Sequence, residues 1–254
     1  MEHEIYALIE KSSFKVHAIV ENYQTRKTDI NVRPDEVFSS ASVIKVPILM
    51  AVLHKVQTSG GDLYETISIK PENVVDFSVL TEQQTKETSI YELLLWMIIT
   101  SDNTATNECI DFIGMDRLNA YFKSIGLKHT IVQRKMMDFD RQQHGFDNET
   151  TAQDMQLLFK KIHRGELLAP EWNMIALEIL CRQRSTESLK RYISDNVKMA
   201  HKTGGLDTVD HDVGIVYSEA GEYFIGIFVS EVTNNEQAKR LIGAISKIVY
   251  DTYK

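Results

Sequence analysis

Residues 42–57 read SVIKVPILMAVLHKVQ, and the rest of the chain can be organised around this stretch. Apolar residues fall on most sides of a helix drawn through it, whereas a helix at a protein surface carries a single apolar stripe. The pattern therefore predicts a helix over Val43–Gln57 that is buried on all sides. Its longest apolar run, Val46–Leu53, is far shorter than the roughly 20 residues that a membrane-spanning helix needs.

Helical patterns continue on the C-terminal side of this stretch to about residue 191. The segment Thr88–Glu92 predicts a helix start leading into Leu93–Thr100, because serine and threonine side chains cap helix N-termini. Further helices are predicted at Thr104–Phe112, Met115–Ile125, Thr151–Arg164 and Glu171–Cys181.

Both ends of the chain instead carry short runs rich in β-branched and aromatic residues, which are typical of strands. The predicted strands are Glu4–Glu10, Phe14–Glu21, Val197–His201, Asp212–Ser218 and Tyr223–Ser230. A hairpin turn at 219–222 joins the last two, and an amphipathic helix over Glu236–Tyr253 closes the chain.

This order predicts an α/β fold of the α+β type. The N-terminal and C-terminal strands should meet in one antiparallel sheet, flanked by helices and interrupted by an inserted all-helical lobe. No repeat or linker divides the chain, so we expect a single catalytic domain over 1–254. Its sheet lobe would cover about 1–41 and 192–254, and its helical lobe about 42–191.

Charge and targeting signals limit the classes of partner. The chain has 254 residues, with 28 Lys and Arg against 36 Asp and Glu, so its net charge is −8. Phosphate binding needs a basic face, and this balance disfavours nucleic acid. The first residues show no signal peptide and no stretch spans a membrane, so we expect a cytoplasmic protein, or an exported one if a signal has been removed. A monomer or weak dimer with a small-molecule substrate is expected.

Cysteines and histidines do not indicate a metal or a cofactor, and we expect neither. Cys109 and Cys181 make neither a disulfide framework nor a zinc site. No pair of the eight histidines has the spacing of a metal site. His201 is expected to border a pocket. His144, His163 and His211 sit among polar residues and are interpreted as surface or turn residues.

Three short strings carry residue types that hydrolytic enzymes use: Ser42-Val43-Ile44-Lys45, Ser101-Asp102-Asn103 and Lys202-Thr203-Gly204. The first alone is expected by chance about once in every 250 residues. All three together are expected in on the order of one chain in a thousand. One string begins the buried helix, one follows an apolar helix, and one ends a strand ahead of two glycines.

The first string has the spacing of an activated nucleophile. Ser42 and Lys45 lie on one face of a helix, so the lysine can reach the serine hydroxyl. Unpaired N–H groups surround a serine at a helix N-terminus. An enclosed lysine can lose its proton near neutral pH and act as a base. The structural alternative is a capping serine followed by an exposed lysine, and the other two strings weigh against it.

The remaining strings supply binding groups. Lys202-Thr203-Gly204-Gly205 offers a cation, a hydroxyl and bare backbone at a strand end. That combination suits a carboxylate lying along the strand edge, with a glycine N–H free to point at an oxyanion. Ser101-Asp102-Asn103 could equally cap a helix, but its place between the other two strings favours a functional interpretation.

Together the three strings resemble the class A β-lactamase and penicillin-binding-protein superfamily of serine hydrolases. They occur in the order of that family and at similar spacing, and the resemblance covers nearly the whole chain. It implies that Ser42 is the nucleophile and Lys45 its base or proton relay. It also implies that Ser101 passes a proton to the departing nitrogen and that the backbone N–H groups of Ser42 and Gly205 form the oxyanion hole.

The resemblance implies substrate-binding roles as well. Asn103 would bind the side-chain amide of the substrate. Lys202 and Thr203 would bind its carboxylate, with Gly204 beside them. Asp102 would be structural, with its side chain turned away from the pocket.

One segment departs from the pattern of the family. In class A β-lactamases a loop begins with an arginine, and the glutamate that activates the deacylating water follows two residues later. An acidic residue near the end of the loop pairs with the arginine. Aligned at Arg134 and Glu149, this chain keeps the loop length and has Met136 in place of the glutamate. A thioether has no proton to exchange. Asp140 stands where an asparagine usually holds water, and Asp138 or Asp140 could reach that water after a small loop shift.

The sequence therefore predicts a serine hydrolase acylated at Ser42 by β-lactams or related carboxylate-bearing amides and esters, with slow deacylation. Two alternatives stay open. A D-Ala-D-Ala-type peptidase or esterase needs no deacylating glutamate. A penicillin-binding sensor module would be acylated once and keep the adduct.

Overall fold

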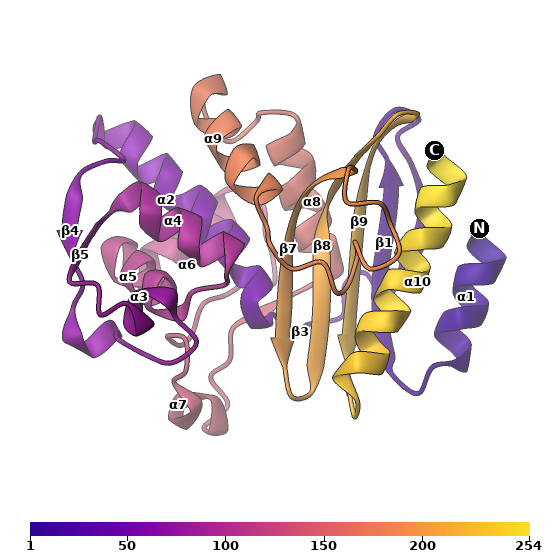
Figure 1. Cartoon of the computed structure of the whole chain (residues 1–254), viewed down its shortest axis with the longest axis horizontal. Coiled ribbons are helices and arrows are strands. Elements are labelled where there is room, and N and C mark those ends of the chain that lie inside the picture. Colours follow the sequence, from indigo (N-terminus) through magenta and orange to yellow (C-terminus); the bar gives the residue numbers. More distant parts are fainter.

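A five-stranded antiparallel sheet in the order β2-β1-β9-β8-β7 lies between two layers of helices in the computed structural model, which describes residues 1–254 (Figure 1). β1 pairs with β9, so the N-terminal and C-terminal strands meet at the centre of the sheet, as the sequence predicts. The sheet strands are β1 (Lys15–Asn22), β2 (Lys27–Val32), β7 (Lys198–Leu206), β8 (Val209–Ser218) and β9 (Gly221–Ser230).

Two helices from the chain ends cover one face of the sheet, and the other helices lie beyond the opposite face (Figure 1). The helices are α1 (Glu2–Lys11), α2 (Lys45–Ser59), α3 (Val79–Glu82), α4 (Ile90–Ile99), α5 (Asn103–Ile113), α6 (Met115–Ser124), α7 (Phe139–Gln143), α8 (Ala152–His163), α9 (Pro170–Cys181) and α10 (Asn235–Tyr253). None of them combines the length and apolar character that a membrane crossing requires. Short elements complete the chain: 3-10 turns η1 (Ala41–Ile44) and η2 (Pro71–Asn73), and strand pairs β3 (Phe38–Ser39) with β6 (Glu149–Thr150) and β4 (Thr66–Ser68) with β5 (Glu87–Ser89).

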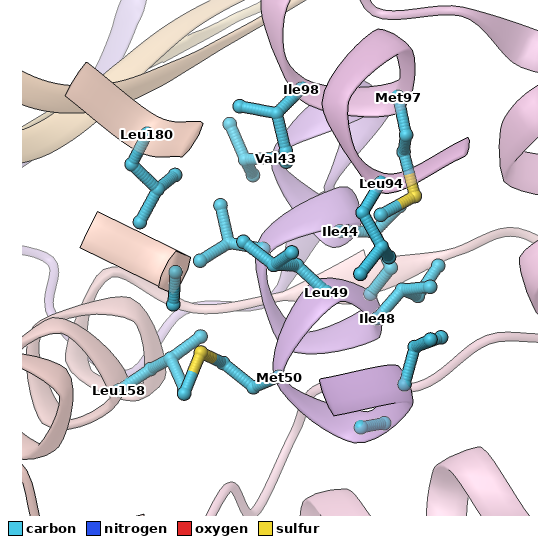
Figure 2. Close-up of a cluster of buried hydrophobic side chains, with 14 of the residues drawn as sticks. Val43, Ile44, Ile48, Leu49, Met50, Leu94, Met97, Ile98, Leu158 and Leu180 are labelled. Atoms are coloured by element: carbon cyan, nitrogen blue, oxygen red, sulfur yellow. The ribbon is translucent and has the colours of Figure 1, made fainter. Parts of the chain in front are cut away.

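The buried helix predicted over Val43–Gln57 is confirmed at the centre of the core, where α2 begins at Lys45 after the 3-10 turn η1. α2 is buried along most of its length, and Figure 2 shows Ile48, Leu49 and Met50 packed among side chains of α4, α8 and α9. The predicted start of α4 is also confirmed, because Ser89 and Glu92 form a reciprocal capping box.

The predicted strand at Glu4–Glu10 is wrong, because this segment is helix α1. Its two buried residues are Ile5 and Ile9, which are four positions apart and therefore share one face of a helix. That face packs with α10 over the sheet. A strand would have buried every second residue instead.

The interpretation of His211 as a surface or turn residue is also wrong. This histidine lies in β8 with 1% of its surface exposed, beside the rings of Phe38 and Phe228. Its Nε2 lies 2.9 Å from the carbonyl oxygen of Ser39, so it donates a hydrogen bond there. The polar residues around it in the sequence concealed a strand that is buried on both faces.

Burial of His211 predicts acid sensitivity. Burial lowers its pKa from 6.5 to about 4, so the unfolded chain binds a proton that the folded chain rejects between these values. The stability contributed by neutral His211 is complete above pH 6.5 and is lost as the pH falls, by about 3 kcal/mol at pH 4. Urea unfolding at pH 7 and pH 4 should show this difference. His211→Gln should lose that much less over the same interval, and an equal loss in both proteins would contradict the assignment.

Candidate active site

Ser42 lies in η1, at the entry to α2 and against the end of β7. Gly204 makes this close approach possible, because a Cβ atom built there would lie 3.1 Å from the backbone nitrogens of Ser42 and Val43. The neighbouring Gly205 is exposed. The amides of Ser42 and Gly205 therefore belong to adjacent backbones, as an oxyanion hole requires.

Lys45 is completely buried, and three oxygens surround its ammonium group. Its Nζ lies 2.7 Å from the carbonyl oxygen of Ser101, 3.1 Å from Ser101 Oγ and 2.9 Å from Asn103 Oδ1. The expected contact with the Ser42 hydroxyl is not among its hydrogen bonds. A buried ammonium must satisfy its three N–H donors, and the fixed acceptors between α4 and α5 do this.

Lys202 approaches the same hydroxyl from the sheet. It is completely buried, and its Nζ lies 3.1 Å from Ser101 Oγ and 2.6 Å from the carbonyl oxygen of Thr203. Ser101 Oγ therefore lies within hydrogen-bond distance of two lysines, which connects them for proton transfer.

Burial shifts both lysines toward their neutral forms. Burial, followed by the charge of Lys202, lowers the pKa of Lys45 well below its usual range. Burial also lowers the pKa of Lys202 to about 7, against the opposing effect of Asp212. Two buried ammonium groups that share one hydroxyl disfavour each other, so both burial and the neighbouring charge favour the neutral form of Lys45.

Asp102 holds the segment between α4 and α5 in place. It is buried, and its carboxylate accepts hydrogen bonds from Ser78 Oγ, Leu80 N and Ala105 N at 2.8, 3.1 and 2.8 Å. These contacts agree with a structural role. They fix the turn in which Ser101 adopts a φ of 60°.

A cavity of about 690 Å³ brings these groups together. Its lining includes Ser42, Ser101, Asn103, Thr203 and Gly205, whereas the two lysines are completely buried and contact the lining residue Ser101. Four of the lining residues have a strained backbone conformation. Non-glycine residues with positive φ occur at Ala41, Phe77, Ser101 and Met137. Strain of this kind is concentrated at functional sites.

Met136 also lines the cavity, and Asn107 holds its backbone there. Asn107 Oδ1 accepts from Met136 N at 2.7 Å, and its Nδ2 donates to the Met136 carbonyl at 3.3 Å. Asn107 was not among the site residues predicted from the sequence. Its spacing of four residues from Asn103 places both on one face of α5, which was a usable signal.

The predicted loop closure by Arg134 and Glu149 is wrong. Arg134 Nε instead lies 2.8 Å from Asp147 Oδ1, and both side chains are largely buried. Asp147 Oδ2 also accepts from Ser39 Oγ at 2.5 Å, which connects the end of the loop to the chain before Ser42. Glu149 pairs through its backbone with Ser39 in β6 and β3. The loop is therefore two residues shorter than the alignment assumed.

Asp138 and Asp140 do not line the cavity. Asp138 caps α7 by accepting a hydrogen bond from Arg141 N. The side chain of Asp140 is 85% exposed beside His144. His201 does not line the cavity either, because it is buried within the sheet on the far side of β7. Two aromatic rings that the sequence analysis missed, Phe77 and Phe139, form exposed parts of the rim.

A serine on a turn, two buried lysines that contact a second serine, and an exposed glycine at a strand end form the arrangement used by serine hydrolases that act by acyl transfer. A sequence model described as the beta-lactamase enzyme family matches residues 1–253, and the chain belongs to this family. Beta-lactamase AER-1 from Aeromonas hydrophila is 28% identical over 233 residues, which cover 89% of this chain and 77% of that protein.

Two other comparisons extend this result. Beta-lactamase VEB-1 from Pseudomonas aeruginosa is 26% identical, over 89% of this chain and 82% of its own. The structure of PBP-A superposes with a TM-score of 0.91 at 29% identity, covering 99% of this chain and 95% of that one. A variant of PBP-A was solved as an acyl-enzyme complex with penicillin G, with the same TM-score, identity and coverage.

Proposed function

We propose that this protein is acylated at Ser42 by β-lactams or by related amides and esters that carry a carboxylate, and that it releases the acyl group slowly. The observation that carries the proposal is the convergence of buried Lys45 and Lys202 on Ser101 Oγ, beside a cavity that Ser42 lines. The acyl-enzyme of the PBP-A variant supports the same chemistry, because that chain shares the fold over its whole length.

Acylation would begin with attack of Ser42 Oγ on the carbonyl carbon. Neutral Lys45 would take the hydroxyl proton, either directly after a small rotation or through Ser101. The amides of Ser42 and Gly205 would stabilise the oxyanion. As the C–N or C–O bond breaks, Ser101 would give its proton to the leaving atom and recover one from Lys45, which balances the step.

Slow release is proposed because the deacylating position lacks a base. Met136 lines the cavity and its backbone is fixed by Asn107, but its thioether cannot accept a proton from water at neutral pH. The two aspartates that could have substituted for a base point elsewhere. Asp138 caps α7, and Asp140 lies in solvent.

Met136 also favours a second function, that of a D-Ala-D-Ala-type peptidase or esterase, which needs no deacylating glutamate. A peptidase that transfers or hydrolyses its acyl group without this glutamate would show rapid turnover of peptide or ester and slow release of a β-lactam. The sensor alternative requires the adduct to persist with every substrate. Comparison of the two substrate types distinguishes these alternatives.

Intact-mass analysis over time tests the proposal. The protein is mixed with benzylpenicillin, and samples are taken from seconds to hours. We expect one adduct per chain to form and then to decay slowly. Absence of any adduct, while a circular-dichroism spectrum confirms a folded protein, would refute acylation. An adduct that never accumulates while penicillin is consumed would refute slow release.

Lys202→Ala should weaken the reaction with acidic substrates selectively. The strand-end cation would be lost, and a charge-assisted hydrogen bond contributes about 1.5–3 kcal/mol, or roughly a 10- to 150-fold change in acylation rate constant. Acylation by a neutral ester that lacks the carboxylate should change much less. Stopped-flow acylation rates with matched acidic and neutral esters measure this. Lys202→Arg, which keeps the charge, is the control, and equal losses on both esters would instead indicate a structural role.

A further inference from the structure

A buried histidine–aspartate pair lies in the sheet behind the end of β7. His201 Nδ1 is 2.8 Å from Asp212 Oδ1, and a carboxylate can only accept, so the histidine donates. Leu189 N donates to Asp212 Oδ2 at 3.0 Å. The side chains of His201 and Asp212 are 2% and 1% exposed. The proposed acyl chemistry uses neither of them.

The register of the sheet places this pair beside Lys202. Thr203 is opposite Asp212 in the β7–β8 pair, and Lys202 is opposite Val213. Opposed residues of an antiparallel pair share a face, so Asp212 and Lys202 lie on opposite faces and one position out of register. Both side chains are completely buried at neighbouring register positions of the β7–β8 pair. Charges interact strongly where water is excluded.

The other charged groups near Lys202 do not stabilise its ammonium form. Lys45 of α2 is a second cation at the same Ser101 hydroxyl. The hydrogen-bond partners of Lys202 are the neutral oxygens of Ser101 and Thr203, and Leu189 contributes only its backbone amide to the His201–Asp212 pair. Asp212 is therefore the carboxylate that opposes the cost of burying Lys202.

We propose that Asp212, held by His201, is a positioning residue that keeps Lys202 in its ammonium form so that the strand end can bind a substrate carboxylate. This inference rests on the proposed function for the role of Lys202, but the charge coupling itself does not depend on any substrate. His201 orients the carboxylate, since its Nδ1–H and the Leu189 amide occupy one oxygen each.

The proposal has a definite pH dependence. Burial lowers the pKa of Lys202 to about 7, and Asp212 raises it against that effect. Lys202 therefore carries its charge below about pH 7 and loses it above. Removal of the Asp212 charge should lower the pKa further, so acidic substrates should lose acylation rate mainly at neutral and alkaline pH.

Asp212→Asn is the direct test, because asparagine keeps the size of the side chain and removes its charge. The second-order rate constant for acylation by benzylpenicillin is measured from pH 5.5 to pH 9. We expect its alkaline limb to move by about one pH unit toward acid, with roughly a tenfold loss at pH 8. Acylation by a neutral ester should keep the wild-type profile. Coincident profiles of Asp212→Asn and wild type with benzylpenicillin would overturn the proposal.

Asp210→Asn is the matched control. Asp210 is a buried carboxylate on the same strand and face, opposite Gly205, and it is hydrogen-bonded to Asn235 at 2.7 Å. Asp210 is hydrogen-bonded to neither His201 nor Ser101, so the alkaline limb of the Asp210→Asn profile should match that of wild type. An equal shift in Asp210→Asn and Asp212→Asn would show a general effect of buried charge and would overturn a specific role for Asp212.

An NMR titration separates this inference from the proposed function. Protein labelled with 13C-lysine is titrated without substrate, and the Lys202 Cε signal is assigned from Lys202→Arg. Asp212→Asn should lower its midpoint by about one pH unit. A lowered midpoint in a protein that penicillin never labels would support the coupling and refute the function. An unchanged midpoint in a protein that penicillin labels normally would support the proposed function and refute the coupling.

A second variant covers the case in which Asp212→Asn fails to fold. Asp212→Ser also removes the charge, and its smaller hydroxyl can accept from His201 or from the Leu189 amide. It should lower the midpoint of the Lys202 Cε signal as well, and an unchanged midpoint would overturn the proposal.

Discussion

Replacing Ser42 with alanine is expected to abolish covalent labelling by benzylpenicillin and by a fluorophosphonate. The hydroxyl of Ser42 lines the 690 Å³ cavity beside the exposed Gly205, and the buried lysines lie beneath it. No other group can replace a deleted nucleophile, so the loss should be complete rather than partial. Intact-mass spectra of wild type and Ser42→Ala after the same incubation measure this effect.

Ser101→Ala is the matched control for this experiment. Ser101 also lines the cavity, and its hydroxyl contacts both lysines. As a proton relay it should affect the rate but not the location of the adduct, so Ser101→Ala should still be labelled, only more slowly. Peptide mapping should place that adduct on Ser42. Labelling that persists in Ser42→Ala, or an adduct on Ser101 in wild type, would remove the central claim.

The buried helix and the strands at both ends of the chain could be predicted from the sequence because each rests on a local pattern. Their meeting in one sheet followed from the order of these elements. α2 is apolar all round, and the runs that form β1, β8 and β9 are rich in β-branched and aromatic residues. α1 could not be distinguished in this way. Its short run EIYALIE has apolar residues compatible with both a strand and a helix, and packing against α10 selects the helix.

The three motif strings were visible as strings, but their contacts were not. The spacing of Ser42 and Lys45 shows that the lysine can reach the serine. It does not show that Lys45 is instead engaged by Ser101 and Asn103, which are distant in sequence and come from another element. Motif chemistry is local, whereas the direction of a long flexible side chain is set by the acceptors around it.

The partner of Arg134 was mispredicted for a related reason. Several carboxylates follow Arg134 within a short stretch, and the sequence alone does not show which of them pairs with the arginine. Asp147 is selected because Ser39 Oγ and the backbone of Asn148 also bind it, which fixes its carboxylate beside the arginine. The role proposed for Asp212 was not visible in the sequence either, since only the register of β7 and β8 brings this residue next to Lys202.

Introducing a glutamate at position 136 is expected to convert a trapped acyl-enzyme into one that turns over. The backbone at Met136 is held by Asn107, and the side chain reaches the cavity that Ser42 lines. A carboxylate placed there would be partly desolvated, which raises its pKa toward the range of a useful general base. General-base catalysis contributes about 10²–10⁴-fold, so deacylation should rise by that order. Burst kinetics with a chromogenic cephalosporin measure it.

Wild type should give a burst of full amplitude followed by little turnover, and Met136→Glu should add a fast steady phase. Met136→Gln is the control, because it places a polar side chain of similar size without a base and should stay slow. Asp138→Asn and Asp140→Asn should leave the wild-type trace unchanged, since neither carboxylate lines the cavity. Rapid turnover in wild type that either aspartate variant abolishes would show that the loop moves an aspartate into the base position. If Met136→Glu acylates normally but releases no faster than Met136→Gln, position 136 does not face the acyl group.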